Sequence, residues 1–99
     1  MKLQVKLMNS ERIAFYVEHG HGIIASVDAG ILWGRASDYG KGHAIVVYGT
    51  IHSNVSGKLI GFVVCDTGSG NMKQYVSMQD FNRMYYIDRG INVTVEAIR

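Results

Sequence analysis

Residues 42–70, GHAIVVYGTIHSNVSGKLIGFVVCDTGSG, decide the fold that we predict for this chain. Two long apolar runs flank the polar turn 54–57, a pattern that predicts an antiparallel hairpin. His43 stands at the outer end of the first run, Asp66 stands at the outer end of the second, and the midpoint between them falls inside the turn. Because paired residues share a face of a sheet, we expect His43 and Asp66 to be near neighbours on one face.

The segments around the hairpin predict an α+β domain. Alternation of polar and apolar residues indicates half-buried strands, an unbroken apolar run indicates a central buried strand, and Ser77 with Asp80 resembles a helix capping box. The predicted elements are strand 2–7, helix 11–18, strand 22–27, loop 29–41, hairpin 42–70, strand 73–76, helix 77–86 and strand 91–98. Residues 1–99 are therefore expected to form a single domain with a mostly antiparallel sheet and two helices.

Composition excludes several classes of protein. The 99 residues are 47% hydrophobic and 18% charged, which is typical of a globular domain. A net charge of +2 without a basic run argues against a nucleic-acid partner. No segment resembles a membrane span or a signal peptide, so we expect a soluble chain without a membrane partner, of unknown compartment.

The chain offers little for metal, cofactor or disulfide chemistry. His19 and His21 lack the cysteine or carboxylate spacing of a metal site, so neither a metal nor a cofactor is expected. Cys65 is the only cysteine, which excludes an internal disulfide. It precedes Asp66 in the same strand and should point to the opposite face, as a small core residue.

The sequence resembles the C-terminal half of papain-like cysteine peptidases. The resemblance rests on Gly42-His43-Ala44 before an apolar strand, a polar turn, a second apolar strand ending in Asp66-Thr67-Gly68, and the upstream segment GIIASVDAGILW. It covers roughly residues 3–86. Within that group the chain is most similar to the bacteriocin-processing peptidases of ABC exporters and to peptidase-like modules of large secreted bacterial toxins.

The resemblance implies roles for two residues. His43 would draw the proton from a cysteine nucleophile, and Asp66 would fix the tautomer and orientation of the imidazole. Independently of the resemblance, the loop just before His43 carries Trp33 and Tyr39, which could line a cleft beside His43 or cover the edge of the sheet as part of the core. The substrate would be a peptide or a protein.

The family's nucleophile should lie on a helix upstream of the first strand, and this sequence begins at Met1 with that strand. Three explanations are open: the chain is the sheet lobe of a peptidase without its helical lobe, one half of a complementing pair, or a degenerate relative that binds without cutting. We therefore expect a partner, which could be an N-terminal lobe, an immunity protein or a second copy of the chain, at an exposed apolar surface.

Two other functions compete with this hypothesis. One is a non-catalytic module that binds peptides or proteins on the same fold. The other is an aspartic peptidase, because residues 63–69, VVCDTGS, resemble the signature of that class around Asp66-Thr67-Gly68. The position of this motif late in the chain argues against the aspartic peptidase.

Overall fold

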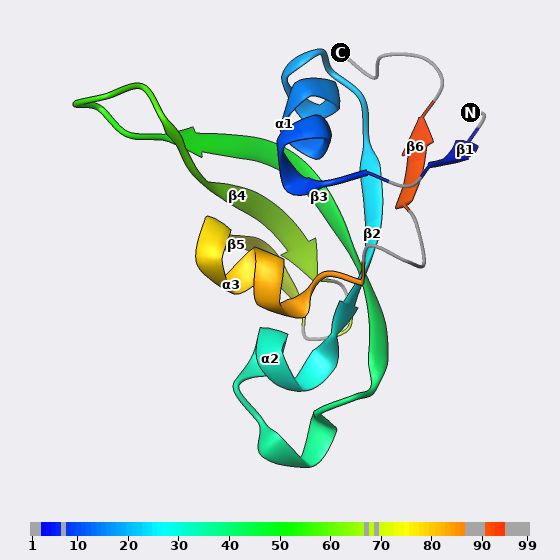
Figure 1. Ribbon diagram of the computed structural model, residues 1–99. Helices are drawn as coiled ribbons and strands as arrows, with labels where there is room; N and C mark the ends of the chain where they lie inside the picture. The colour runs from blue at the N-terminus through cyan, green and yellow to red at the C-terminus, as the bar shows by residue number, and fades with distance from the viewer. Residues whose placement is uncertain (1–2, 7, 67, 69, 87–90, 95–99) are drawn as a thin grey trace.

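The predicted hairpin forms the centre of the fold. The computed structural model describes residues 3–6, 8–66, 68, 70–86 and 91–94. Strand β3 (Gly42–His52) pairs with strand β4 (Leu59–Asp66), and the backbone N–H of Ser53 donates to the carbonyl of Lys58 at 2.8 Å where the chain turns. The pair extends well beyond the rest of the sheet (Figure 1).

Four further strands complete a six-stranded sheet in the order β1-β6-β2-β3-β4-β5. They are β1 (Leu3–Lys6), β2 (Ile23–Asp28), β5 (Asn71–Ser77) and β6 (Ile91–Thr94). Each pairing of neighbouring strands among the described residues is antiparallel. The predicted α+β class with an antiparallel sheet is therefore confirmed, while residues 2, 7 and 95–98 of the predicted terminal strands lie outside the described residues.

Both predicted helices are present. Helix α1 (Ser10–Glu18) begins after Asn9, whose side chain accepts from the backbone N–H of Arg12 at 2.9 Å. Helix α3 (Met78–Met84) begins after Ser77, whose hydroxyl accepts from the backbone N–H of Asp80 at 3.1 Å. Such side-chain acceptors satisfy N–H groups that the first helical turn leaves unpaired. In the described part of the chain, no helix has the length and apolar character needed to cross a membrane.

The prediction of a plain loop over residues 29–41 was wrong. This segment contains the short helix α2 (Ala29–Trp33) and the 3-10 turn η1 (Ala36–Asp38). The side chain of Asp28 caps α2 by accepting from the backbone N–H of Ile31. The three glycines of the segment suggested a loop, but the Asp28 cap and the packing of α2 against the sheet stabilise a helix.

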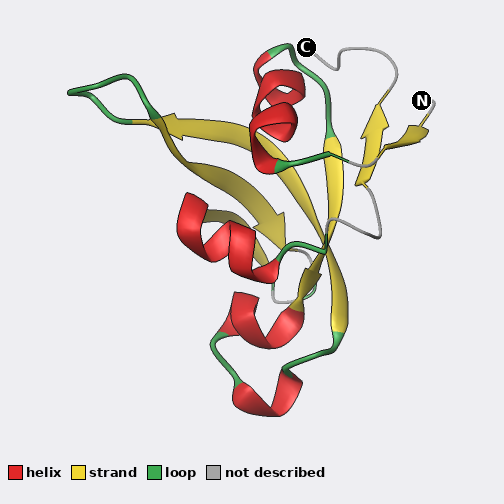
Figure 2. Ribbon diagram, viewed as in Figure 1, coloured by secondary structure: helices red, strands yellow, loops and turns green. Residues whose placement is uncertain are grey.

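All three helices lie on one face of the sheet (Figures 1 and 2). Strand β3 alternates accordingly, because Ile45 and Val47 are buried under the helices while Val46 and Tyr48 are exposed on the other side. The rings of Phe62 on β4 and Phe81 on α3 meet with centroids 4.7 Å apart in the core. We call the uncovered side the open face; its exposed apolar residues are Val46, Tyr48, Met72 and Tyr75.

Cys65 belongs to the open face. It pairs with Val46 across the hairpin, is partly exposed, and has its Sγ 3.8 Å from the Sδ of Met72. The expectation that it points away from the face of Asp66 is confirmed. The expectation of a core position was wrong, because the helices of the described residues cover only the other side of the sheet.

A histidine clamp holds the far end of the hairpin. In His52, Nδ1 lies 2.9 Å from the carbonyl oxygen of Gly57, and Nε2 lies 2.5 Å from Oε1 of Glu18 at the end of α1. A carbonyl and a carboxylate both accept hydrogen bonds, so these two contacts favour the imidazolium, in which both ring nitrogens donate. The hydrogen bond with Glu18 raises the pKa of His52, and the same bond lowers the pKa of Glu18.

This clamp should make the stability of the protein depend on pH. A raised pKa in the folded state means that the contribution of His52 is complete below its unfolded value of 6.5 and is lost as the pH rises through the folded value. In the wild type we expect a small loss of stability as the pH rises above 6.5, and His52→Gln should remove it; the loss is small because both side chains are 43% exposed. Urea denaturation at several pH values measures this, and an unchanged pH slope in the variant would contradict the clamp.

Candidate functional site: the His43, Asp66 and Trp33 cluster

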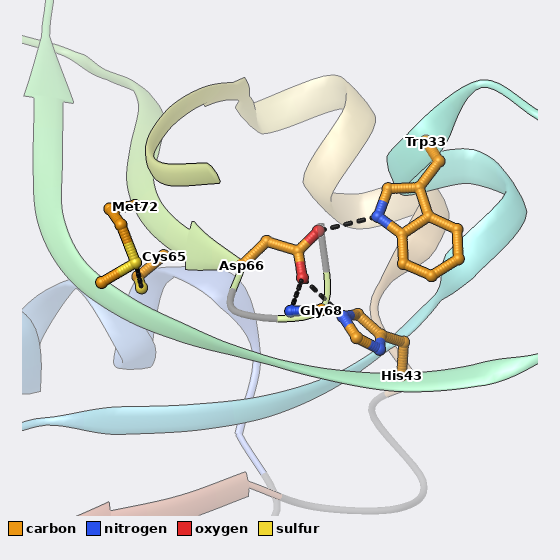
Figure 3. Close-up of polar contacts among 6 residues, drawn as sticks. All are labelled: Trp33, His43, Cys65, Asp66, Gly68 and Met72. Carbon is orange, nitrogen blue, oxygen red and sulfur yellow. Dashed lines mark hydrogen bonds and ion pairs between the residues drawn. The ribbon is translucent and has the colours of Figure 1, made fainter. Parts of the chain in front are cut away.

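His43 and Asp66 meet at the end of the hairpin opposite the clamp. The register pairs Val46 with Cys65, so Ile45 would be opposite Asp66 if the ladder continued, and His43 is two residues further along the same face. Nε2 of His43 lies 2.7 Å from Oδ1 of Asp66 (Figure 3). The predicted proximity is confirmed, although the two residues are diagonal neighbours and not a directly opposed pair.

The Asp66 carboxylate has no exposure to solvent and is surrounded by donors. Trp33 Nε1 donates to Oδ2 at 2.7 Å, and the backbone N–H of Gly68 donates to Oδ1 at 3.0 Å. Indole and backbone N–H groups can only donate, so both oxygens of Asp66 accept. These contacts replace the water that a buried carboxylate loses and hold Oδ1 toward the imidazole.

The hydrogen bond with Asp66 determines which nitrogen of His43 is available for chemistry. The carboxylate oxygen accepts, so Nε2 of His43 carries the proton and Nδ1 of the neutral ring has the free electron pair. No residue in the described part of the chain makes a hydrogen bond to Nδ1, and the side chain is 21% exposed. His43 can therefore accept a proton at Nδ1 while Asp66 stabilises the resulting imidazolium.

His52 provides an internal comparison. It also contacts a carboxylate, but both of its ring nitrogens are engaged as donors, so no nitrogen is left to take up a proton. Of these two histidine and carboxylate pairs, only the pair at His43 has the arrangement of a general base with an orienting partner.

Of the two aromatic residues that precede His43 in the sequence, only Trp33 contacts it among the described residues. The Trp33 ring lies against the His43 ring, with centroids 5.0 Å apart, and also donates to Asp66. Trp33 thus supports the pair directly. Tyr39 is 58% exposed and packs over Gly30, where a Cβ would come within 2.2 Å of its Cδ1, and no contact joins it to His43 among the described residues.

Gly68 is a part of the site whose role the sequence did not reveal. Its backbone N–H donates to Asp66, and a Cβ at this position would lie only 2.6 Å from Cε1 of His43. Glycine is thus the residue that lets the backbone approach the imidazole this closely. The sequence contained the signal, an Asp-x-Gly at the end of a strand, but its spacing does not distinguish this role from other loop functions.

Comparison with models of known protein families gave no match, and neither curated proteins nor solved structures gave a significant match. In the described part of the chain, no group of three or more His, Cys, Asp or Glu side chains could hold a metal ion. The chemistry open to this chain therefore follows from the geometry of His43, Asp66 and Trp33.

Removal of the indole donor should destabilise the protein measurably. Trp33→Phe leaves Oδ2 of the buried Asp66 without this partner, and an unmade hydrogen bond to a buried polar group costs about 1–3 kcal/mol. We expect a loss of this size in the free energy of unfolding from urea titration. Tyr39→Phe, which removes a hydroxyl from an exposed ring, should change it by no more than about 0.5 kcal/mol. Equal effects of the two variants would show that the indole bond contributes nothing.

Proposed function

We propose that this chain is the sheet lobe of a papain-like cysteine peptidase, of bacterial toxin or peptide-processing type. His43 serves as general base and acid, and Asp66 orients it. One observation carries the proposal: Nε2 of His43 is bound to a fully buried carboxylate, while its Nδ1 has no hydrogen bond from the described residues. The resemblance of the sequence supports the same assignment.

The proposed reaction uses the free electron pair of Nδ1. The thiol of a cysteine gives its proton to Nδ1, and the thiolate attacks the carbonyl carbon of the peptide. When the C–N bond breaks, the imidazolium returns the proton to the leaving amine, and water then hydrolyses the thioester with His43 again as base. Asp66 stabilises the imidazolium in both steps, and Trp33 keeps the carboxylate in place.

The thiol must come from outside this chain. Cys65 is the only cysteine, and it faces the open side of the sheet, whereas His43 faces the helices. Figure 3 shows Cys65 with Met72, apart from the cluster of His43, Asp66 and Trp33. A complementing helical lobe, carried on the same protein or on a partner, would supply the nucleophile at Nδ1.

Complementation tests the proposal. The chain with Cys65→Ser is mixed with a cysteine-bearing helical lobe of a papain-like peptidase, and the rate of alkylation of that cysteine by iodoacetamide is measured together with peptide cleavage. We expect the chain to accelerate alkylation, and His43→Ala to slow it on the order of 100-fold, since a positioned base contributes at least that factor. The matched control is His52→Ala, which removes the other carboxylate-bound histidine and should leave the rate unchanged.

Two results would contradict this function. An acceleration that persists in His43→Ala would mean that the imidazole does not activate the thiol. Cleavage at acid pH by the isolated chain, lost in Asp66→Asn, would instead support an aspartic peptidase. The burial of Asp66 and its bond to His43 argue against that alternative, which needs a carboxylate open to a second carboxylate.

A second candidate function, a non-catalytic module that binds a protein or peptide, is favoured by one observation. The open face exposes apolar side chains on β3 and β5, the two strands that flank β4, including Tyr75 at 65% and Met72 at 64%. Clustered exposed apolar residues are typical of interaction surfaces. This face lies opposite His43, so a partner bound there would not deliver a thiol to the imidazole.

Association through the open face can be measured directly. If this face is used, sedimentation velocity should show self-association that rises with concentration, or a stable complex with an added partner. Tyr75→Glu should abolish either one because it buries a charge. Asp80→Asn, an exposed change on α3, serves as the control. A monomer at all concentrations that binds no partner would contradict the binding-module function.

A further inference from the structure

Asp28 brings together three segments of the chain beside the site. Its side chain is almost buried, at 8% exposure. Oδ2 accepts from the backbone N–H of Gly40 at 2.7 Å and from the hydroxyl of Tyr86 at 3.0 Å, and Oδ1 accepts from the backbone N–H of Ile31 at 3.2 Å. These hydrogen bonds, the one from Gly40 first, lower the pKa of Asp28. The carboxylate is thus an acceptor shared by α2, the end of the following loop and the residues after α3.

The contacts of Asp28 close the base of the segment that contains Trp33. The segment leaves the sheet at Ala29 and returns at Lys41, where the backbone N–H of Ala29 donates to the carbonyl of Lys41 at 2.9 Å. Asp28 holds both ends, through Ile31 on the outgoing side and Gly40 on the returning side. Between them, Gly30 packs closely against Tyr39. The segment is therefore a closed loop whose orientation depends on its base.

Helix α2 cannot orient Trp33 by itself. It has five residues, far fewer than an isolated helix needs for stability, so its direction is set by its cap and its packing. Trp33 is its last residue and must place Nε1 within 2.7 Å of Asp66. A small rotation of α2 at its capped end would move the indole out of hydrogen-bonding distance.

We propose that Asp28 is a positioning residue of the site: it fixes the base of the 29–41 loop so that Trp33 reaches Asp66, which in turn holds His43. Its meaning for catalysis rests on the proposed function, whereas the coupling of Asp28 to Trp33 does not. Among the described residues, no hydrogen bond joins the Asp28 side chain to His43. It acts on the imidazole through Trp33 and Asp66.

The single tryptophan makes the coupling measurable in the isolated chain. Its indole N–H gives one resonance, which should be shifted downfield and exchange slowly with water because it donates to a buried carboxylate. Asp28→Asn keeps the side-chain volume but replaces one acceptor oxygen with a donor nitrogen, so the backbone N–H groups of Ile31 and Gly40 no longer each have an acceptor oxygen. We expect the resonance to move upfield and its exchange to become about tenfold faster, the factor that corresponds to the loss of one ordinary hydrogen bond.

A matched control separates this effect from general loss of stability. Ile13→Val removes one methylene from the core side of α1, which lies at the opposite end of the sheet from α2 (Figure 1), and should lower stability without moving the indole resonance. Asp28→Asn must change the resonance and its exchange more than Ile13→Val does. If Asp28→Asn does not fold, Tyr86→Phe, which removes one donor only, should shift the resonance in the same direction. If Asp28→Asn folds and its indole signal is unchanged, the proposal is overturned. If Asp28→Asn does not fold, an unchanged indole signal in Tyr86→Phe overturns it.

The complementation assay then connects the coupling to the site. Asp28→Asn and Trp33→Phe should each slow alkylation of the supplied cysteine, and the double variant should be no slower than the more damaging single change, because both act through Asp66. Additive losses would overturn the route through Trp33. If no variant and no wild-type chain accelerates alkylation but the indole resonance still responds to Asp28→Asn, the proposed function fails and the positioning role of Asp28 stands.

Discussion

The buried carboxylate of Asp66 constrains this whole end of the molecule. Removing a carboxylate from water costs several kcal/mol unless hydrogen-bond donors replace its hydration. Here the donors come from three separate segments: the indole of Trp33 on α2, the backbone of Gly68 after β4, and the imidazole of His43 on β3. Movement of any one of these segments would remove a donor from the buried carboxylate. The requirement for full pairing therefore holds the imidazole with little freedom.

Strand β3 carries a histidine bound to a carboxylate near each of its ends, and the difference between the two shows how environment assigns a role. At His52 a carbonyl and a carboxylate engage both nitrogens, so the ring acts as a cationic link between the hairpin and α1. At His43 a single carboxylate engages one nitrogen and leaves the other for chemistry. Identical side chains thus serve structure at one end of the strand and a candidate base at the other.

The sequence was sufficient for the antiparallel hairpin, the α+β class and the proximity of His43 to Asp66, because alternating apolar runs and a polar turn act locally. It was insufficient where long-range packing decides. Cys65 lies on the open face because the helices pack on the other side of the sheet. The role of Trp33 depends on a hydrogen bond to a residue 33 positions away in the sequence. The network of Asp28 joins residues as distant as Tyr86, and no local pattern contains that information.

The unequal exposure of the two histidine and carboxylate pairs has a consequence for solution conditions. Both side chains of the His52 and Glu18 pair are 43% exposed, so mobile ions reach them, whereas Asp66 is fully buried. At 0.1 M salt, screening acts over about 10 Å in water and weakens exposed pairs far more than buried ones. The two ends of β3 should therefore respond differently to ionic strength. Concentrated salt weakens the contact of His52 with Glu18 on α1, while the hydrogen bond of His43 to Asp66 is kept.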